Sequence, residues 1–230
     1  MDIRRVSTGA GVLDGLLSGG YESDTVTTIY GPSGSGKTNI CMLAAVFMAR
    51  KGRKVIYIDT EGGFSAERLK QIAPSDYADL INNIIFLLPT DFDEQRNAFS
   101  KLSGLIDDDT GIVIVDTIAM LYRLEMGKTK NVYDVNKDLG LQISYLNEIT
   151  RKRGIPVLIT NQVYASFEDR ESIRMVGGDI LKYGSKCLIS LEKFHDGLRC
   201  ASIKKHRSIA EDRSVMFKIV NSGIEEINKG

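Results

Sequence analysis

The apolar residues of this 230-residue chain fall into two patterns that alternate along its length. Short continuous apolar runs, which are typical of strands buried on both faces of a parallel sheet, end in a polar residue or a proline. Between these runs, apolar residues recur every three or four positions, which is the repeat of an amphipathic helix. The runs predict strands at 25–30, 54–59, 84–88, 112–116 and 156–162, and the repeats predict helices at 39–51, 65–72, 91–106 and 132–153.

The last part of the chain changes to a run of strands without helices between them. Strands are predicted at 187–191, 198–203 and 215–220, and Asp196-Gly197 between the first two favours a tight hairpin. This order predicts one α/β domain with a mostly parallel central sheet, helices on both faces and antiparallel strands at one edge. We expect residues 1–24 to lead into this domain without a separate N-terminal DNA-binding domain, and we expect long loops at 122–131 and 164–178.

The stretch Gly31-Pro32-Ser33-Gly34-Ser35-Gly36-Lys37-Thr38 joins the first predicted strand to the first predicted helix. It fits the phosphate-loop pattern, in which glycines let successive backbone N–H groups turn toward phosphate oxygens at a helix N-terminus. Lys37 is expected to reach the β- and γ-phosphates, and the Thr38 hydroxyl is expected to ligate Mg²⁺. A chance glycine-rich turn is the alternative, but the flanking strand and helix favour a nucleotide site. The predicted binding residues are Gly31, Ser33, Gly34, Ser35, Gly36, Lys37 and Thr38.

Three further polar residues end predicted strands or follow them directly. The carboxyl ends of parallel strands form the ligand-binding edge of a sheet, so Glu61, Asp116 and Gln162 are expected beside the loop. Asp116 is suited to hold Mg²⁺ through water, Glu61 to deprotonate an attacking water, and Gln162 to sense the γ-phosphate. The alternatives are a strand-ending acid without a metal, an acid at a helix start and a buried structural amide.

Composition and charge limit the class of protein. The 30 basic and 30 acidic residues give a formal net charge of zero, so overall charge does not favour non-specific coating of nucleic acid. The basic run Lys204-Lys205-His206-Arg207 is either a solvated face or a contact to phosphate or to a DNA backbone. Three cysteines without paired spacing predict neither a disulfide framework nor a zinc site. Because no signal-like or membrane-spanning apolar run is found, we expect a cytoplasmic protein without membrane contact.

Several of these motifs, taken in order along the chain, resemble those of the RecA-like recombinases, including the archaeal RadA group. The resemblance extends from about Ser7 to Gly223 and implies a RecA-like P-loop NTPase core. Without an N-terminal domain, the chain is most similar to the archaeal RadA paralogues that lack that domain. The resemblance is carried by Ser7-Thr8-Gly9, the phosphate loop, Tyr57-Ile58-Asp59-Thr60-Glu61-Gly62, Asp116 followed by Leu121-Tyr122-Arg123, Ile159-Thr160-Asn161-Gln162-Val163, and Gly177-Gly178.

The resemblance also implies cofactors and residue roles. It implies ATP and Mg²⁺, with Glu61 as catalytic base, Lys37 and Gln162 as further catalytic residues and Asp116 as the second-strand acid. Arg68 lies in a segment that is near the base in relatives. The resemblance implies DNA-facing loops at 124–131 and 164–176, and it puts 204–207 where some relatives reach a nucleotide held by a neighbouring subunit. The implied phosphate or DNA contacts are Lys128, Lys130, Arg170, Arg174, Lys204, Lys205, His206 and Arg207.

Two departures from the family pattern restrict these implications. Such recombinases polymerise through a phenylalanine-bearing linker ahead of the ATPase domain, and we expect this chain to lack that linker, so self-association would need another route. In the second loop, Glu168, Asp169 and Glu171 outnumber Arg170 and Arg174. Repulsion between these acids and phosphates should weaken DNA contact there and make it salt-sensitive.

The resemblance therefore implies an ATP-binding accessory, or mediator-type, protein of homologous recombination and DNA repair. Its expected partners are single-stranded DNA, a RadA-like main recombinase and, among further recombination proteins, a Holliday-junction resolvase. Weak DNA-dependent ATP hydrolysis is expected, because many relatives act only when a neighbour supplies cations to the site. The alternatives are a complete DNA-stimulated, filament-forming recombinase, a KaiC-like regulatory ATPase that does not act on DNA, and a scaffold that keeps ATP as a structural part.

Overall fold

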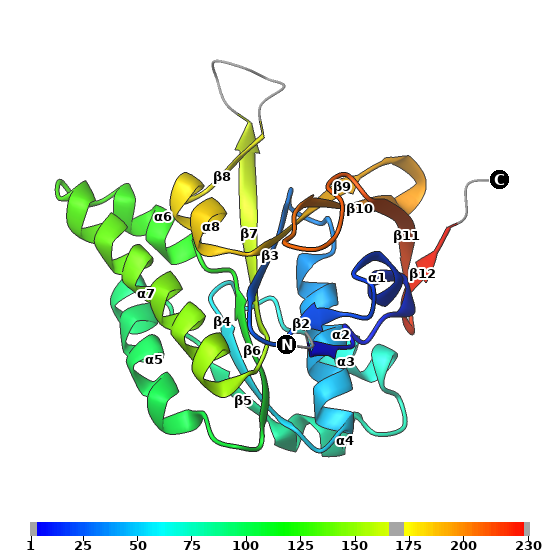
Figure 1. Ribbon diagram of the computed structural model, residues 1–230. Coiled ribbons are helices and arrows are strands. Elements are labelled where there is room, and N and C mark those ends of the chain that lie inside the picture. The colour runs from blue at the N-terminus through cyan, green and yellow to red at the C-terminus, as the bar shows by residue number, and fades with distance from the viewer. Residues whose placement is uncertain (1–3, 166–172, 228–230) are drawn as a thin grey trace.

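The computed structural model describes residues 4–165 and 173–227, and its centre is a ten-stranded sheet (Figure 1). The strand order is β12-β11-β10-β9-β3-β7-β6-β4-β5, with β8 (Ile173–Met175) paired to β7. The parallel strands are β3 (Val26–Gly31), β4 (Lys54–Asp59), β5 (Ile84–Leu87), β6 (Thr110–Asp116), β7 (Val157–Ala165) and β9 (Cys187–Lys193). The strands that continue the sheet with antiparallel pairing are β10 (Leu198–Lys205), β11 (Ser214–Val220) and β12 (Gly223–Glu226). The predicted parallel sheet with an antiparallel edge is confirmed.

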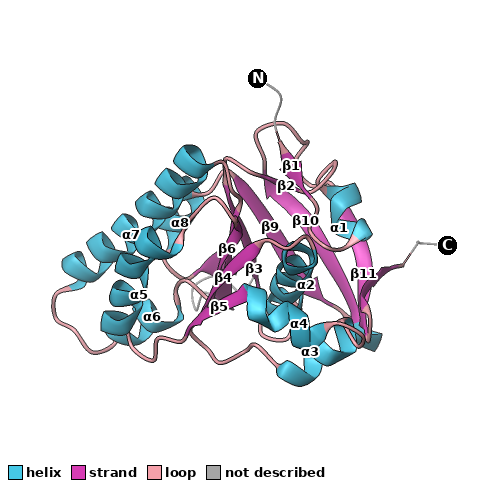
Figure 2. Cartoon of the chain, turned by 90° about the horizontal axis from the view of Figure 1, so that it is seen from below, coloured by secondary structure: helices cyan, strands magenta, loops and turns pink. Residues whose placement is uncertain are grey.

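Helices cover both faces of this sheet, as Figures 1 and 2 show from two directions. The helices on one face are α5 (Phe92–Leu105), α6 (Met120–Met126), α7 (Val132–Arg153) and α8 (Gly178–Gly184). Those on the other face are α1 (Gly11–Leu16), α2 (Lys37–Arg50), α3 (Ala66–Ile72) and α4 (Tyr77–Leu80), which is followed by a 3-10 turn, η1 (Ile81–Asn83). Successive strand residues point to opposite faces, so Ile56 and Ile58 enter the first core while Val55 and Tyr57 enter the second. This explains why the strands are continuous apolar runs.

The amphipathic helices lie where their repeats predict them, with ends within two residues of the predicted bounds. α7 spans Val132–Arg153 as expected, and its core residues are Val135, Leu139, Ile143, Leu146 and Ile149. Gly154 ends α7 in a left-handed conformation with φ of 62°. The predicted cap of α3 is also confirmed, because the Ser65 hydroxyl accepts a hydrogen bond from the backbone N–H of Arg68.

The first residues form a small unit that packs on the domain. β1 (Arg5–Val6) pairs antiparallel with β2 (Tyr21–Glu22), and α1 lies between them in sequence. The Asp14 carboxylate accepts hydrogen bonds from the Ser7 hydroxyl and from the backbone N–H and hydroxyl of Thr8. The Ser7-Thr8 motif therefore closes the turn into α1, whose leucines pack in the same core as Phe217 of β11.

The two long loops predicted from polar composition are wrong in part. The stretch 122–131 begins inside α6, where Leu121 and Tyr122 are buried, and the Tyr122 hydroxyl donates to Asn136 of α7 at 2.6 Å. The stretch 164–178 includes the end of β7 and all of β8, and Gly178 starts α8. Short elements such as β8 and α8 owe their structure to pairing and packing partners, which a local pattern does not reveal.

The N-terminal and C-terminal edges add elements that the pattern does not predict. β1, β2 and β12 are two to four residues long, too short for a periodicity to register. The hairpin at Asp196-Gly197 is confirmed, since both residues have positive φ in η2 (His195–Gly197) and β9 pairs antiparallel with β10 around it. Within the described residues, no helix is long and apolar enough to cross a membrane.

Candidate nucleotide-binding site

Four parallel strands bring the predicted site residues to one edge of the sheet. β3 ends at Gly31, which is in register with Gln162 of β7, and β4 ends at Asp59, which is in register with Asp116 of β6. Glu61 follows β4 after one residue. Residues that are far apart in sequence therefore meet at the carboxyl ends of the strands, where α/β sheets bind ligands.

The phosphate loop fills the connection between β3 and α2. Lys37 is the first residue of α2, and its Nζ donates hydrogen bonds to the carbonyl oxygens of Gly31 at 2.9 Å and Pro32 at 3.0 Å. These bonds fold the loop over the amino end of the helix. Gly36 has φ of 105°, and a Cβ at Gly31 would lie only 2.4 Å from the carbonyl oxygen of Leu191. The loop therefore needs glycine at both positions.

Two buried ionisable groups, Lys37 and Asp116, lie close enough to interact electrostatically. Lys37 is 7% exposed, and burial lowers the pKa of its ammonium, while the carboxylates of Asp116 and Glu61 oppose this shift. Asp116 is 2% exposed, and burial raises the pKa of its carboxyl group, while hydrogen bonds from three hydroxyls oppose this shift. The three hydroxyls belong to Thr160, Thr38 and Tyr57.

This donor set fits a triphosphate with Mg²⁺. An anion beside Lys37 would favour its charged form, and a cation beside Thr38 and Asp116 would favour the carboxylate, so both buried groups would regain a partner. Hydroxyl and carboxylate oxygens are ligands that Mg²⁺ prefers. The Ser35 hydroxyl in the loop is also buried, and among the described residues it has no hydrogen-bond partner. A buried polar atom without a partner is unusual and is consistent with a ligand in the loop.

Glu61 and Gln162 are in direct contact. The Gln162 side-chain amide donates to both carboxylate oxygens of Glu61, at 2.8 Å and 3.0 Å, across 101 positions of sequence. The hydroxyl of buried Thr117 donates to the same carboxylate at 2.9 Å. The predicted base and the predicted sensor are therefore joined in one hydrogen-bonded group next to Asp116.

Sequence reasoning missed the residue that shapes the segment around Glu61. Asp59 is 3% exposed, and its carboxylate accepts hydrogen bonds from the backbone N–H groups of Glu61 at 3.2 Å, Gly63 at 3.1 Å and Phe64 at 2.9 Å. A carboxylate that ends a strand and precedes a glycine-rich turn is a recognisable signal for such a turn. The signal was present in Asp59-Thr60-Glu61-Gly62-Gly63.

Arg68 is tied to the sheet edge through its side chain. Its guanidinium donates to Asn39 Oδ1 at 2.8 Å and to the carbonyl oxygens of Val220 at 2.7 Å, Asn221 at 3.1 Å and Gly223 at 3.2 Å. These bonds hold the β11–β12 turn against α2 and α3. The position of Arg68 on a short helix gave no sign of these contacts.

The basic run Lys204 to Arg207 extends from the middle of the sheet away from the phosphate loop of the same chain. Lys205 of β10 is in register with Leu188 of β9, which in turn pairs with Thr28 of β3. The next residues extend toward the start of β3, where the Arg207 guanidinium binds both oxygens of Asp24, at 2.6 Å and 2.9 Å. Within one chain the structure does not bring this run to Lys37.

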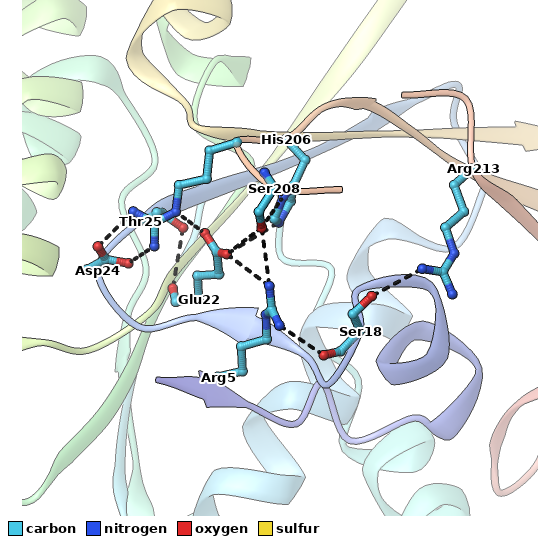
Figure 3. Close-up of polar contacts among 9 residues, drawn as sticks. Arg5, Ser18, Glu22, Asp24, Thr25, His206, Ser208 and Arg213 are labelled. Carbon is cyan, nitrogen blue, oxygen red and sulfur yellow. Dashed lines mark hydrogen bonds and ion pairs between the residues drawn. The ribbon is translucent and has the colours of Figure 1, made fainter. Parts of the chain in front are cut away.

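The side chains of this run are bound by acidic residues and by backbone carbonyl oxygens. Buried Glu22 contacts Arg207 at 2.7 Å and Arg5 at 3.3 Å, and it lies 3.8 Å from the ring of His206, whose side chain is 2% exposed (Figure 3). Burial lowers the pKa of His206. The remaining bonds run from Lys204 to Asp212, and from Lys205 to the carbonyl oxygens of Lys182 and Ser185.

The other predicted DNA contacts lie on two segments. Lys128 and Lys130 are exposed in the connection between α6 and α7. Arg174 belongs to β8, in register with Tyr164 of β7. Arg170, like Glu168, Asp169 and Glu171, lies outside the described residues.

A family model for Rad51 matches residues 1–227 of this chain. The chain belongs to the Rad51 family. It is 43% identical over 229 residues to the DNA repair and recombination protein RadB of Methanobrevibacter smithii, covering 97% of this chain and 96% of that protein. It is 42% identical over 219 residues to RadB of Methanocaldococcus jannaschii, covering 94% and 100%. A crystal structure of the RadB recombinase matches with a TM-score of 0.82 and 35% identity, covering 96% of this chain and 99% of that one.

Membership of the Rad51 family confirms the resemblance to RecA-like recombinases and to the paralogues known as RadB. Both RadB relatives named above come from methanogens, which agrees with an archaeal type of sequence. RecA-like recombinases are nucleotide-binding ATPases, so the phosphate loop of this Rad51-family chain stands where a nucleotide site is expected.

Proposed function

We propose that this chain is an ATP-binding accessory protein of homologous recombination and DNA repair, which binds single-stranded DNA and assists a RadA-like main recombinase. The observation that supports this most directly is the Glu61–Gln162 contact beside the phosphate loop. It joins a candidate base to a strand that leads away from the site. The relatives named DNA repair and recombination protein RadB, similar over nearly the whole chain, supply the biological setting.

In this proposal, Lys37 and the loop N–H groups would hold the triphosphate, and Thr38 and Asp116 would hold Mg²⁺, the latter through water. When bound, Mg²⁺ would supply charge neutralisation at the phosphates. Glu61 accepts a proton from the attacking water. Gln162 and Thr117 both donate to the Glu61 carboxylate, so its oxygens are occupied by these donors instead of by an attacking water. Hydrolysis is therefore slow while these contacts persist.

The same contact offers a route from nucleotide to surface. With a nucleotide bound, the Gln162 amide could donate to the γ-phosphate instead of to Glu61, and this change of partner would move a side chain of β7. The end of β7 pairs with β8 through Val163, Tyr164 and Ala165. Nucleotide binding at the phosphate loop would thus change the position of the paired ends of β7 and β8, which rise above the sheet in Figure 1.

Electrostatics support modest DNA binding at the surface. The net charge of zero provides little long-range attraction, so binding depends on local cations such as exposed Lys128 and Lys130. For single strands, log K falls with log salt by about 0.7 per neutralised phosphate. Two or three contacts therefore give a slope of roughly −1.4 to −2.

The test is fluorescence anisotropy of labelled single-stranded DNA against salt, with and without ATP and Mg²⁺. We expect a shallow salt dependence, tighter binding with ATP, and weaker binding when Lys128 and Lys130 are both replaced by Gln. Lys101→Gln, an exposed lysine of α5, is the matched control. Absence of salt-dependent DNA binding in every nucleotide state would contradict the proposal, and a hexamer with that behaviour would favour a KaiC-like regulatory ATPase.

Two further outcomes separate the remaining alternatives. Regular filaments with many-fold stimulation of hydrolysis by single-stranded DNA would favour a complete recombinase. A Lys37→Ala variant tests the scaffold alternative, because it removes the loop ammonium. Loss of ATP-dependent DNA and recombinase binding in this variant supports a nucleotide switch, whereas unchanged binding with lost hydrolysis contradicts it. Pull-down with a RadA-like recombinase and with a Holliday-junction resolvase identifies the protein partner.

A further inference from the structure

The antiparallel edge of the sheet forms the outer wall of the phosphate loop. A Cβ at Gly36 would lie 3.1 Å from Ile219 of β11 and 3.7 Å from both Cδ and Nε of Arg199 in β10. A Cβ at Gly34 would lie 3.7 Å from Lys193 Nζ of β9. β9, β10 and β11 therefore contact the loop, although none of them carries a predicted site residue at this end of the sheet.

Arg199 makes the polar contact of this wall. Its Nη2 donates to the carbonyl oxygen of Gly34 at 3.3 Å, and its Nη1 donates to the carbonyl oxygen of Gly197 at 2.7 Å. Its Nε is buried and has no partner among the described residues. In register, Arg199 pairs with Lys193 on one side and with Phe217 on the other, so it sits in the middle of three strands. One guanidinium thus links the phosphate loop to the β9–β10 hairpin.

The bond to Gly34 fixes the orientation of one peptide plane in the loop. In a trans peptide the carbonyl and the following N–H point in opposite directions, so the N–H of Ser35 points away from Arg199. That N–H donates to the carbonyl oxygen of Pro32 at 3.3 Å, and Lys37 Nζ donates to the same oxygen. The Gly34–Ser35 peptide is therefore held from both sides, with its carbonyl on the side of Arg199.

We propose that Arg199 is a positioning residue for the nucleotide, which holds the Gly34–Ser35 peptide from outside and so fixes the backbone path of the loop around the phosphates. This rests on the proposed nucleotide binding. The loop cradles phosphates that ATP and ADP share, so loss of Arg199 weakens both nucleotides equally. Loss of a γ-phosphate sensor weakens only ATP. Because Arg199 also binds Gly197, a ligand that displaces the hairpin changes nucleotide affinity.

The test compares Arg199→Ala and Arg199→Lys with wild type by calorimetric titration of ADP and of a non-hydrolysable ATP analogue, with Mg²⁺. Because the bond from Arg199 to Gly34 is long, at 3.3 Å, and exposed to solvent, its loss predicts a Kd only about five- to tenfold higher for both nucleotides in Arg199→Ala. Arg199→Lys keeps the charge but reaches one carbonyl, so it regains part of the affinity. The matched control is Arg213→Ala, because exposed Arg213 likewise donates to a carbonyl, that of Gly15, and to Ser18.

The thermal unfolding midpoint of each variant, measured without nucleotide, distinguishes a loss of stability from a loss of nucleotide positioning. If Arg199→Ala lowers the midpoint but binds both nucleotides as wild type does, Arg199 is only structural and the inference is overturned. A loss confined to the ATP analogue would also overturn it. If Arg199→Ala does not fold, a wild-type Kd for Arg199→Lys overturns the inference and an equal loss for both nucleotides supports it. Wild-type protein that binds neither nucleotide would overturn the proposed function as well.

Discussion

Replacement of Asp59 by Asn tests whether this buried carboxylate shapes the catalytic segment. Asp59 Oδ1 accepts from the backbone N–H groups of Glu61 and Gly63, and Oδ2 accepts from that of Phe64. An Asn side chain keeps one acceptor oxygen but turns an amide N–H toward the N–H of Phe64. Loss of one hydrogen bond to a charged group costs about 1.5–3 kcal/mol. Relief of the repulsion between Asp59 and Asp116 offsets part of this, which leaves about 2 kcal/mol.

A loss of about 2 kcal/mol should lower the thermal midpoint of a chain of this size by roughly 4–8 °C. Hydrolysis should fall by about tenfold or more, because Glu61 moves with its backbone and small displacements of a catalytic group are costly. Nucleotide affinity should change little, because Lys37 and its loop contacts are untouched. The assays are differential scanning calorimetry, phosphate release and ADP titration, with exposed Asp79→Asn as control. A variant with wild-type midpoint and wild-type hydrolysis would refute the reasoning.

Three further predictions concern single side chains. Gln162→Ala should leave ADP affinity unchanged but abolish the ATP-induced gain in DNA affinity, measured by anisotropy; a retained gain would exclude Gln162 as sensor. Arg68→Ala should lower stability by about 1–2 kcal/mol in urea unfolding, because turn carbonyls lose their donor, whereas surface Lys70→Ala should not. Burial and the charges of Arg5 and Arg207 lower the pKa of His206 below 6.5, opposed by Glu22. The unfolded chain then binds a proton at His206 more readily than the folded chain does. The contribution of neutral His206 to the free energy of unfolding is therefore complete above about pH 6.5, and it is lost as the pH falls through the lowered pKa. His206→Gln should flatten that decline in melts from pH 7 to 5, whereas exposed His195→Gln should not; an unchanged slope for His206→Gln would show that His206 does not cause it.

The sequence by itself determined the elements whose pattern is local. A phosphate loop is a contiguous eight-residue motif, so Gly31 to Thr38 could be found without a fold. α7 was predicted with its final bounds because five apolar residues at helical spacing, from Val135 to Ile149, cover about four turns. Asp116 and Gln162, the last residues of two predicted strands, could be assigned to one edge because parallel strands share a direction. These inferences need only periodicity and chain order.

Only the tertiary structure decided which side chains meet. Glu61 and Gln162 are 101 positions apart, and Arg199 and Gly34 are 165 apart, so their contacts depend on strand order and register. The sequence of the basic run at 204–207 gives no sign of partners, yet the fold brings Glu22 and Asp24 to Arg207, Asp212 to Lys204 and two carbonyl oxygens to Lys205. Local patterns report which face of an element is apolar. Polar contacts between elements are fixed only when packing brings those faces together, because a hydrogen bond tolerates errors of tenths of an ångström and a register shift moves a residue by several.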